Sequence, residues 1–97
     1  MNIGVCRIDL EFPASHSLKD KRKVLRSIIG RVQSRFNVAI AEVDHNDSWK
    51  VATLGITCVS NDSRHANEVL SHVVDYVETL RGDTELLDYE TEIMVGV

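Results

Sequence analysis

The sequence has no apolar run long enough to cross a membrane. A membrane-spanning helix needs about 20 consecutive apolar residues, and no stretch of this 97-residue chain approaches that length. Residues 1–4 also lack the basic and then apolar order of a secretory signal. We therefore expect a protein without membrane contact that works in the cytoplasm.

Cysteine is scarce, and familiar catalytic motifs are absent. Cys6 and Cys58 lie in apolar patterns without CxxC spacing or nearby histidine ligands, so we interpret them as buried free thiols. The sequence has no P-loop, no GxGxxG and no Ser–His–Asp order typical of a hydrolase. These absences predict a protein that is not an enzyme and that holds no cofactor.

One short segment does combine residue types that bind metals. Glu42, Asp44 and His45 follow one another closely at the end of a predicted strand. Side chains at these spacings cannot all point at one ion unless the chain bends sharply. We predict no metal site there, and the sequence leaves open whether the three residues form any other ligand site.

Hydrophobic periodicity predicts six elements in the order βαββαβ. Strands are expected at 2–12, 38–44, 51–60 and 86–97, with helices at 17–36 and between the capping residues 60–62 and Gly82. Two split βαβ units predict a ferredoxin-like α+β sandwich, with a four-stranded antiparallel sheet in the order 4-1-3-2 and both helices on one face. With 43% hydrophobic residues, the length suits a single domain over residues 1–97.

The alternation also assigns a side of the sheet to each strand residue. In strand 38–44 we expect Ala39, Ala41 and Val43 to face the helices. In the last strand we expect the same of Leu87, Tyr89, Ile93, Val95 and Val97. The charged residues would then occupy the open side, namely Arg7, Asp9, Glu11, Glu42, Asp44, Asp88, Glu90 and Glu92.

This open side is predicted to be a poor platform for RNA. RNA-recognition domains of the same topology stack bases on aromatic side chains of the two central strands, within a positive field. Here Asp9 and Glu11 lie on the first strand, and strand 51–60 contains no aromatic residue. RNA would have to bind elsewhere on the molecule.

Positive charge is concentrated in the first predicted helix, which carries seven of the chain's 11 lysine and arginine residues. Only Asp20 opposes them, so residues 16–36 carry a charge of +6 within a chain whose formal net charge is −4, which leaves −10 for the rest. Ser17 and Asp20 have the spacing of a capping box that starts this helix. Flexible cationic side chains along a helix contact phosphates without a base code.

We predict that this helix binds RNA, for example on a ribosomal particle. The expected phosphate-binding residues are Lys19, Lys21, Arg22, Lys23, Arg26 and Arg35, with Trp49 as a candidate aromatic contact. Two alternatives stay open. The helix could dock on the acidic surface of a protein partner or of a second copy in a homodimer, or it could be a solvated face without a partner.

The segment from His16 to Asp62 resembles the YlxP-like family of small bacterial domains. The resemblance lies in Ser17–Lys19, Lys21–Arg22, Phe36–Val38, Ala41–His45, Trp49, Ala52–Gly55 and Val59–Asp62. It implies a ferredoxin-like fold, and the family has no assigned activity and no catalytic residues to carry over. Its genes often lie beside genes for transcription elongation, initiation and ribosome-binding factors, which implies RNA or ribosome work in the cytoplasm.

Overall fold

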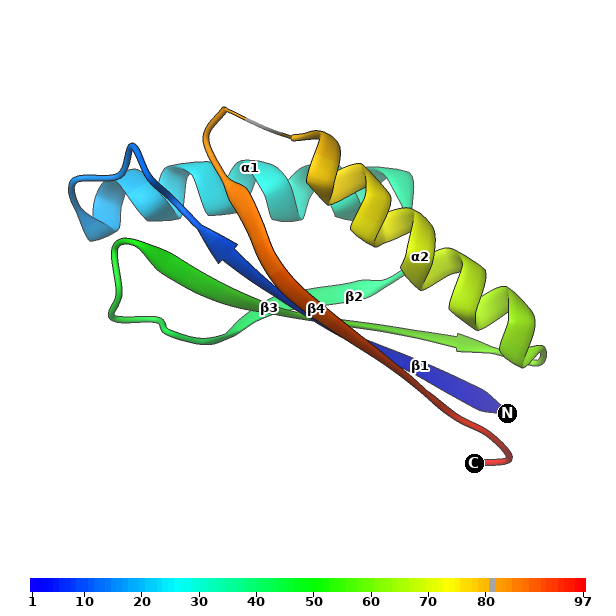
Figure 1. Cartoon of the computed structure of the whole chain (residues 1–97). Helices are drawn as coiled ribbons and strands as arrows, with labels where there is room; N and C mark the ends of the chain where they lie inside the picture. Colours follow the sequence, from blue (N-terminus) through cyan, green and yellow to red (C-terminus); the bar gives the residue numbers. More distant parts are fainter. Residues whose placement is uncertain (81) are drawn as a thin grey trace.

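The computed structural model of the chain describes residues 1–80 and 82–97, and its elements follow the predicted order. They are β1 (Asn2–Glu11), α1 (Leu18–Arg35), β2 (Ala39–Asp44), β3 (Val51–Ser60), α2 (Ser63–Thr79) and β4 (Glu85–Met94). The strands form one antiparallel sheet in the order β2-β3-β1-β4, and both helices lie on one side of it (Figure 1). The predicted ferredoxin-like sandwich is confirmed.

Helix α1 begins at the predicted capping box. The Ser17 hydroxyl accepts a hydrogen bond from the Asp20 backbone N–H at 3.0 Å, and the Asp20 carboxylate accepts one from the His16 N–H at 3.0 Å. The first bond satisfies one of the backbone donors that a helix start leaves unpaired, and the second ties the residue before the N-cap to the first turn. The carboxylate also lies near the positive end of the helix dipole.

The core lies between the sheet and the two helices. Residues every three or four positions in each helix are buried against alternate residues of the two central strands, which is the pattern that amphipathic periodicity predicts. The fully or nearly fully buried members include Ile8, Leu10, Leu25, Val32, Leu54, Ile56, Leu70, Val73 and Val77. In the described parts of the chain, no helix combines the length and the apolar character that crossing a bilayer requires.

Strand β2 faces the opposite way from the prediction over residues 39–42, and a bulge between Glu42 and Asp44 then returns Asp44 to the open side, as predicted. Ile40 and Glu42 pair with Ile56 and Leu54, two buried residues on the helix side of β3, so they also face the helices. The residues predicted to face inward lie exposed on the open side instead, namely Ala39, Ala41 and Val43. Burying Ile40 removes more apolar surface from water than burying an alanine. Strand β2 therefore turns Ile40 toward the helices, although this leaves the smaller apolar residues beside it on the open side.

Strand β4 differs from the prediction at both ends. Its register with β1 shifts beside Leu87, so that Leu86 pairs with Leu10 and packs partly buried against the core, whereas Leu87 is 53% exposed. Ile93 and Tyr89 both lie on the helix side as predicted, although Tyr89 at the sheet edge is 52% exposed. The strand ends at Met94, so the exposed Val95 and Val97 lie outside it. An extra residue at a bulge reverses the alternation that follows it.

Candidate functional site

The outer side of α1 carries a stripe of exposed cations. Lys19, Arg22, Lys23 and Arg26, which we call the cationic stripe, are all exposed, with Arg22 at the edge of the stripe beside the buried Leu25 and the other three farther from it. The ion pairs found among residues 1–80 and 82–97 are Arg7–Asp9 and Lys21–Glu42, so none of the four is paired with a carboxylate there. Their charges face solvent and are available to an external anion.

Lys21 does not belong to the cationic stripe, and its prediction as a phosphate-binding residue is wrong. Its side chain is 0% exposed, and its Nζ donates hydrogen bonds to the carbonyls of His45 at 2.9 Å and Val51 at 3.1 Å. Lys21 precedes Leu25 by four residues, so both lie on the core side of the helix. A phosphate in solvent cannot reach the ammonium group.

Glu42 neutralises the buried lysine. Its Oε2 lies 2.9 Å from Lys21 Nζ, and its side chain is 17% exposed. The same ammonium group donates to two backbone carbonyls, so Lys21 bridges the Glu42 carboxylate and the β2–β3 connection. Glu42 therefore lies beneath α1 and not on the open face where we expected it.

His45 connects the β2–β3 hairpin to β1 through side chains. Its backbone has a positive φ of 63°, a conformation that few residues other than glycine adopt. Its Nδ1 lies 3.0 Å from Thr53 Oγ1, which in turn donates to Asp9 Oδ1 at 2.8 Å. Because the Thr53 proton points at Asp9, we assign the proton of the contact with His45 to Nδ1. Asp9 also pairs with Arg7 at 3.3 Å, which completes the chain of contacts.

The same network sets the charge of Asp9. Burial by itself would raise the pKa of Asp9, but the hydrogen bond from Thr53, together with the hydrogen bond and charge of Arg7, outweighs it. The pKa of Asp9 therefore lies below the ordinary value for an aspartate. The network holds an ionised carboxylate, paired with the Arg7 guanidinium, in the middle of the open face.

The three residues with metal-ligand chemistry do not converge on one point. Glu42 lies under α1 beside Lys21, whereas His45 Nδ1 turns toward Thr53. The Asp44 carboxylate accepts a hydrogen bond from the His45 backbone N–H at 2.7 Å. In the parts of the chain that the structure describes, no three His, Cys, Asp or Glu side chains are grouped so as to hold a metal ion.

Arg35 and Trp49 extend the basic surface in different directions. Arg35 is exposed at the far end of α1, about 24 Å along the helix axis from Lys19, and its guanidinium lies 4.5 Å from the ring centroid of Tyr76. Trp49 lies on the β2–β3 connection, where it is 43% exposed and Lys50 Nζ lies 5.3 Å from its ring centroid. The contacts of Lys21 with that connection place Trp49 at the same end of the molecule as the first turns of α1.

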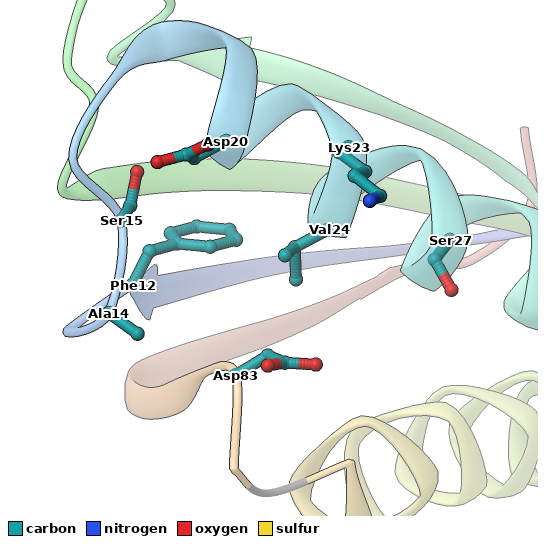
Figure 2. A pocket seen from close by; sticks show the side chains of 8 residues that line it. All are labelled: Phe12, Ala14, Ser15, Asp20, Lys23, Val24, Ser27 and Asp83. Atoms are coloured by element: carbon teal, nitrogen blue, oxygen red, sulfur yellow. The ribbon is translucent and has the colours of Figure 1, made fainter.

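A groove beside the start of α1 was not predicted from the sequence. It has a volume of about 540 Å³ and lies between α1, the end of β1 and the loop before β4. Figure 2 shows Asp20 and Asp83 at separate points of its wall, with Phe12 and Val24 between them and Lys23 above. The two carboxylates come from distant parts of the chain, so no local motif announces them. The negative charge of these two carboxylates disfavours the binding of an anion in the groove itself.

Residues 3–91 match the family described as "Protein of unknown function (DUF503)". The chain belongs to this family. It is also 38% identical to the uncharacterized protein YlxP of Bacillus subtilis (strain 168) over 77 residues, which cover 79% of this chain and 84% of the relative. The resemblance to YlxP-like proteins seen in the sequence is confirmed, and no specific activity comes with it.

Two solved structures resemble the chain at low sequence identity. The de novo designed protein Foldit4 is 11% identical with a TM-score of 0.54, and the alignment covers 100% of both chains. A dimeric ferredoxin-like protein from an uncultured marine organism is 10% identical with a TM-score of 0.45, over 97% of this chain and 94% of the other. The first likeness supports the fold alone, and neither bears on function.

Proposed function

We propose that the chain is a cytoplasmic binding protein, without catalytic activity, that contacts structured RNA such as that of a ribosomal particle through the cationic stripe of α1. One observation carries this proposal. Four cations lie exposed on one side of one helix, and none forms an ion pair with the described part of the chain. Such groups gain binding energy by replacing the counterions of a phosphate backbone.

The rest of the molecule would orient the RNA. The open face of the sheet lies on the side opposite the helices (Figure 1). It carries carboxylates from three strands, including Asp9, Asp44, Asp88 and Glu90. A polyanion is therefore repelled from one side of the molecule and attracted to the other. Trp49 and Arg35 would widen the contact at the two ends of α1.

An acidic protein surface is the second candidate partner for the same helix. A homodimer with the basic helix on the acidic sheet is less well supported, because these two surfaces lie on opposite sides of the sheet (Figure 1). A two-fold pair cannot engage both surfaces in one interface, and head-to-tail contacts would leave an unpaired surface at each end of the stack. RNA needs only the helix side.

The test is the affinity for a labelled RNA hairpin, measured by fluorescence anisotropy over a range of salt concentrations. The variant Arg22→Glu/Arg26→Glu is compared with Arg31→Glu/Arg64→Glu, which changes the net charge equally at exposed residues outside the cationic stripe. We expect the first variant to lose most of the affinity and the second to retain most of it. Circular dichroism confirms that both variants are folded.

Two results would contradict this proposal. Equal losses of RNA affinity in both variants would mean that only the net charge of the protein matters. If the wild type did not bind RNA, the proposed function itself would be wrong. Co-sedimentation with bacterial ribosomal particles then tests the biological target. The wild type should sediment with the particles and the Arg22→Glu/Arg26→Glu variant should not.

A further inference from the structure

Strand β4 is a long edge strand whose protection against pairing is limited to its bulge and its acidic side chains. Among the described residues it pairs with β1 alone, so the backbone groups on its outer side have no neighbouring strand. Natural edge strands are commonly short, or carry proline or lysine that prevents further pairing. β4 has 10 residues and contains neither residue type, whereas the opposite edge strand β2 has 6 residues.

The two sides of β4 differ in chemistry. On the open face, Asp88, Glu90 and Glu92 lie in register with Asp9, Arg7 and Val5 of β1. On the helix side, Tyr89 is half exposed at the edge, next to the exposed Leu87 at the bulge. The strand contains four carboxylates and no cation. An incoming strand would meet negative charge on one side and apolar surface on the other.

The carboxylates beyond the bulge are available for new contacts. A hollow of about 470 Å³ on the β1–β4 surface is lined by Glu90, Glu92, Thr91, Val5 and Arg7. The ion pair of Arg7 is with Asp9, and neither Glu90 nor Glu92 forms an ion pair within the part of the chain that the structure describes.

We propose that the outer edge of β4 binds an extended peptide segment in which basic residues alternate with apolar ones, as a fifth strand of the sheet. Main-chain hydrogen bonds would supply affinity, and alternate side chains would supply specificity. The basic residues would lie beside Glu90 and Glu92, and the apolar residues would lie beside Thr91 and Ile93, next to Tyr89. The N–H of Tyr89 donates to the Asp88 carboxylate at 2.8 Å, so the new ladder would run over residues 90–94.

Charge complementarity selects this occupant over a second copy of β4. Pairing two β4 strands would bring acidic strands together with no cation on either, and like charges on neighbouring strands are destabilising. The proposal concerns a different surface and a different partner from the proposed RNA contact. Either can fail while the other holds.

The first experiment titrates ¹⁵N-labelled protein with a short peptide that alternates lysine and valine. We expect the chemical-shift changes to be concentrated at residues 90–94 and at the adjoining residues of β4. A peptide that alternates glutamate and valine should produce none. Shift changes centred on any other element, or none with the lysine peptide, would overturn the proposal.

A second experiment separates strand addition from attraction between charges. The lysine peptide is made in two N-methylated versions, one methylated at the valines and the other at the lysines. Both versions keep the charge of the parent peptide, but each lacks the backbone N–H donors along one of the two edges of the extended peptide. If the segment adds to the sheet, at least one version binds about tenfold more weakly. If both bind like the parent peptide, the contact is charge alone and the proposal is wrong.

Variants of the protein then test the specificity. Glu90→Gln/Glu92→Gln should weaken binding of the lysine peptide about fivefold, because two cross-strand charge pairs are lost. The matched control Glu68→Gln/Asp75→Asn removes two exposed carboxylates from α2 and should leave binding unchanged. Equal weakening of peptide binding in both variants would contradict the proposed binding site. The proposal would also be wrong if the protein dimerised and its concentration-dependent chemical-shift changes fell on residues 90–94, since a second copy would then occupy the edge.

Discussion

Lys21 Nζ lies 2.9 Å from Glu42 Oε2 beneath α1, with the lysine side chain fully buried. The same nitrogen donates to the carbonyls of His45 and Val51, at the two ends of the β2–β3 connection. One side chain thus joins the first turns of α1 to β2 and to the start of β3. The cation predicted from the sequence to bind RNA instead holds together the elements on which the cationic stripe rests.

Replacing Lys21 should destabilise the fold strongly. Lys21→Met keeps most of the apolar side chain but leaves Glu42 without its cation and two carbonyls without their donor. Breaking a buried ion pair by removing one partner costs about 3 kcal/mol. We expect a loss of that size in the free energy of unfolding, measured by urea denaturation followed by circular dichroism.

A double-mutant cycle isolates the ion pair from the carbonyl contacts. Glu42→Leu alone leaves the buried ammonium unpaired, so it should also destabilise the protein. In Lys21→Met/Glu42→Leu both charges are absent, and the double variant should be more stable than the sum of the single losses implies. Strictly additive losses, or a loss below about 1 kcal/mol for Lys21→Met, would show that the pair is effectively solvated.

The fold was predictable because its signals are local and repeated. Apolar spacing of three or four residues marks both helices, alternation marks the two central strands, and Ser17 with Asp20 marks the start of α1. These patterns depend on residues near one another in the sequence. The topology then follows from the order of the elements and the handedness of their connections.

The candidate site was predictable only in part. Lys21 shares the core side of α1 with Leu25, so the spacing placed it inward although its residue type favoured the surface. Lys21 can be buried because Glu42 neutralises its charge, and Glu42 comes from another element, β2. The orientation of β2 depended on the size of Ile40, and that of β4 on a bulge beside Leu87. Both depend on pairing between strands, which one sequence does not reveal.

Two glycines should respond to alanine in opposite directions. A Cβ at Gly4 would lie 2.8 Å from Leu70 Cδ1 and 3.1 Å from Cys58 Sγ in the core, whereas a Cβ at Gly30 of α1 meets nothing within 4 Å. Gly4→Ala should therefore cost about 1–3 kcal/mol through overpacking. Gly30→Ala should stabilise the protein by about 1 kcal/mol, because alanine favours a helix interior. Thermal unfolding of both variants measures the signs, and a stabilising Gly4→Ala would contradict the close contact with α2.

The two thiols should be slow to react at neutral pH. Burial raises the pKa of Cys6, against a hydrogen bond from Thr91, and it also raises the pKa of Cys58. A thiol with a raised pKa forms less thiolate at a given pH, so alkylation of the folded protein should be slower than that of the urea-unfolded protein. Iodoacetamide labelling followed by mass spectrometry measures both rates, and equal rates at neutral pH would contradict the burial.

The same shifts predict how stability changes in alkaline solution. The unfolded thiols ionise near the ordinary pKa of about 8.5, whereas the folded thiols stay neutral to higher pH. Their contribution to stability is complete below that value and is lost as the pH rises through the folded pKa values. Urea denaturation should show a decline above about pH 8.5. The variant Cys6→Ala/Cys58→Ala, although less stable overall, should decline less over the same range.

Substitutions at two neighbouring residues of α1 should affect stability and RNA affinity separately. Arg22→Gln removes a cation of the stripe, so it should lower the slope of log affinity against log salt concentration by about one unit and leave the urea midpoint nearly unchanged. Lys21→Met should do the reverse, losing stability while the salt slope of the folded protein stays as in the wild type. Both measurements are made at a temperature where each variant is folded. If Lys21→Met lowered the slope as much as Arg22→Gln, the buried lysine would have to reach the phosphate backbone, and the assignment of the two roles would be wrong.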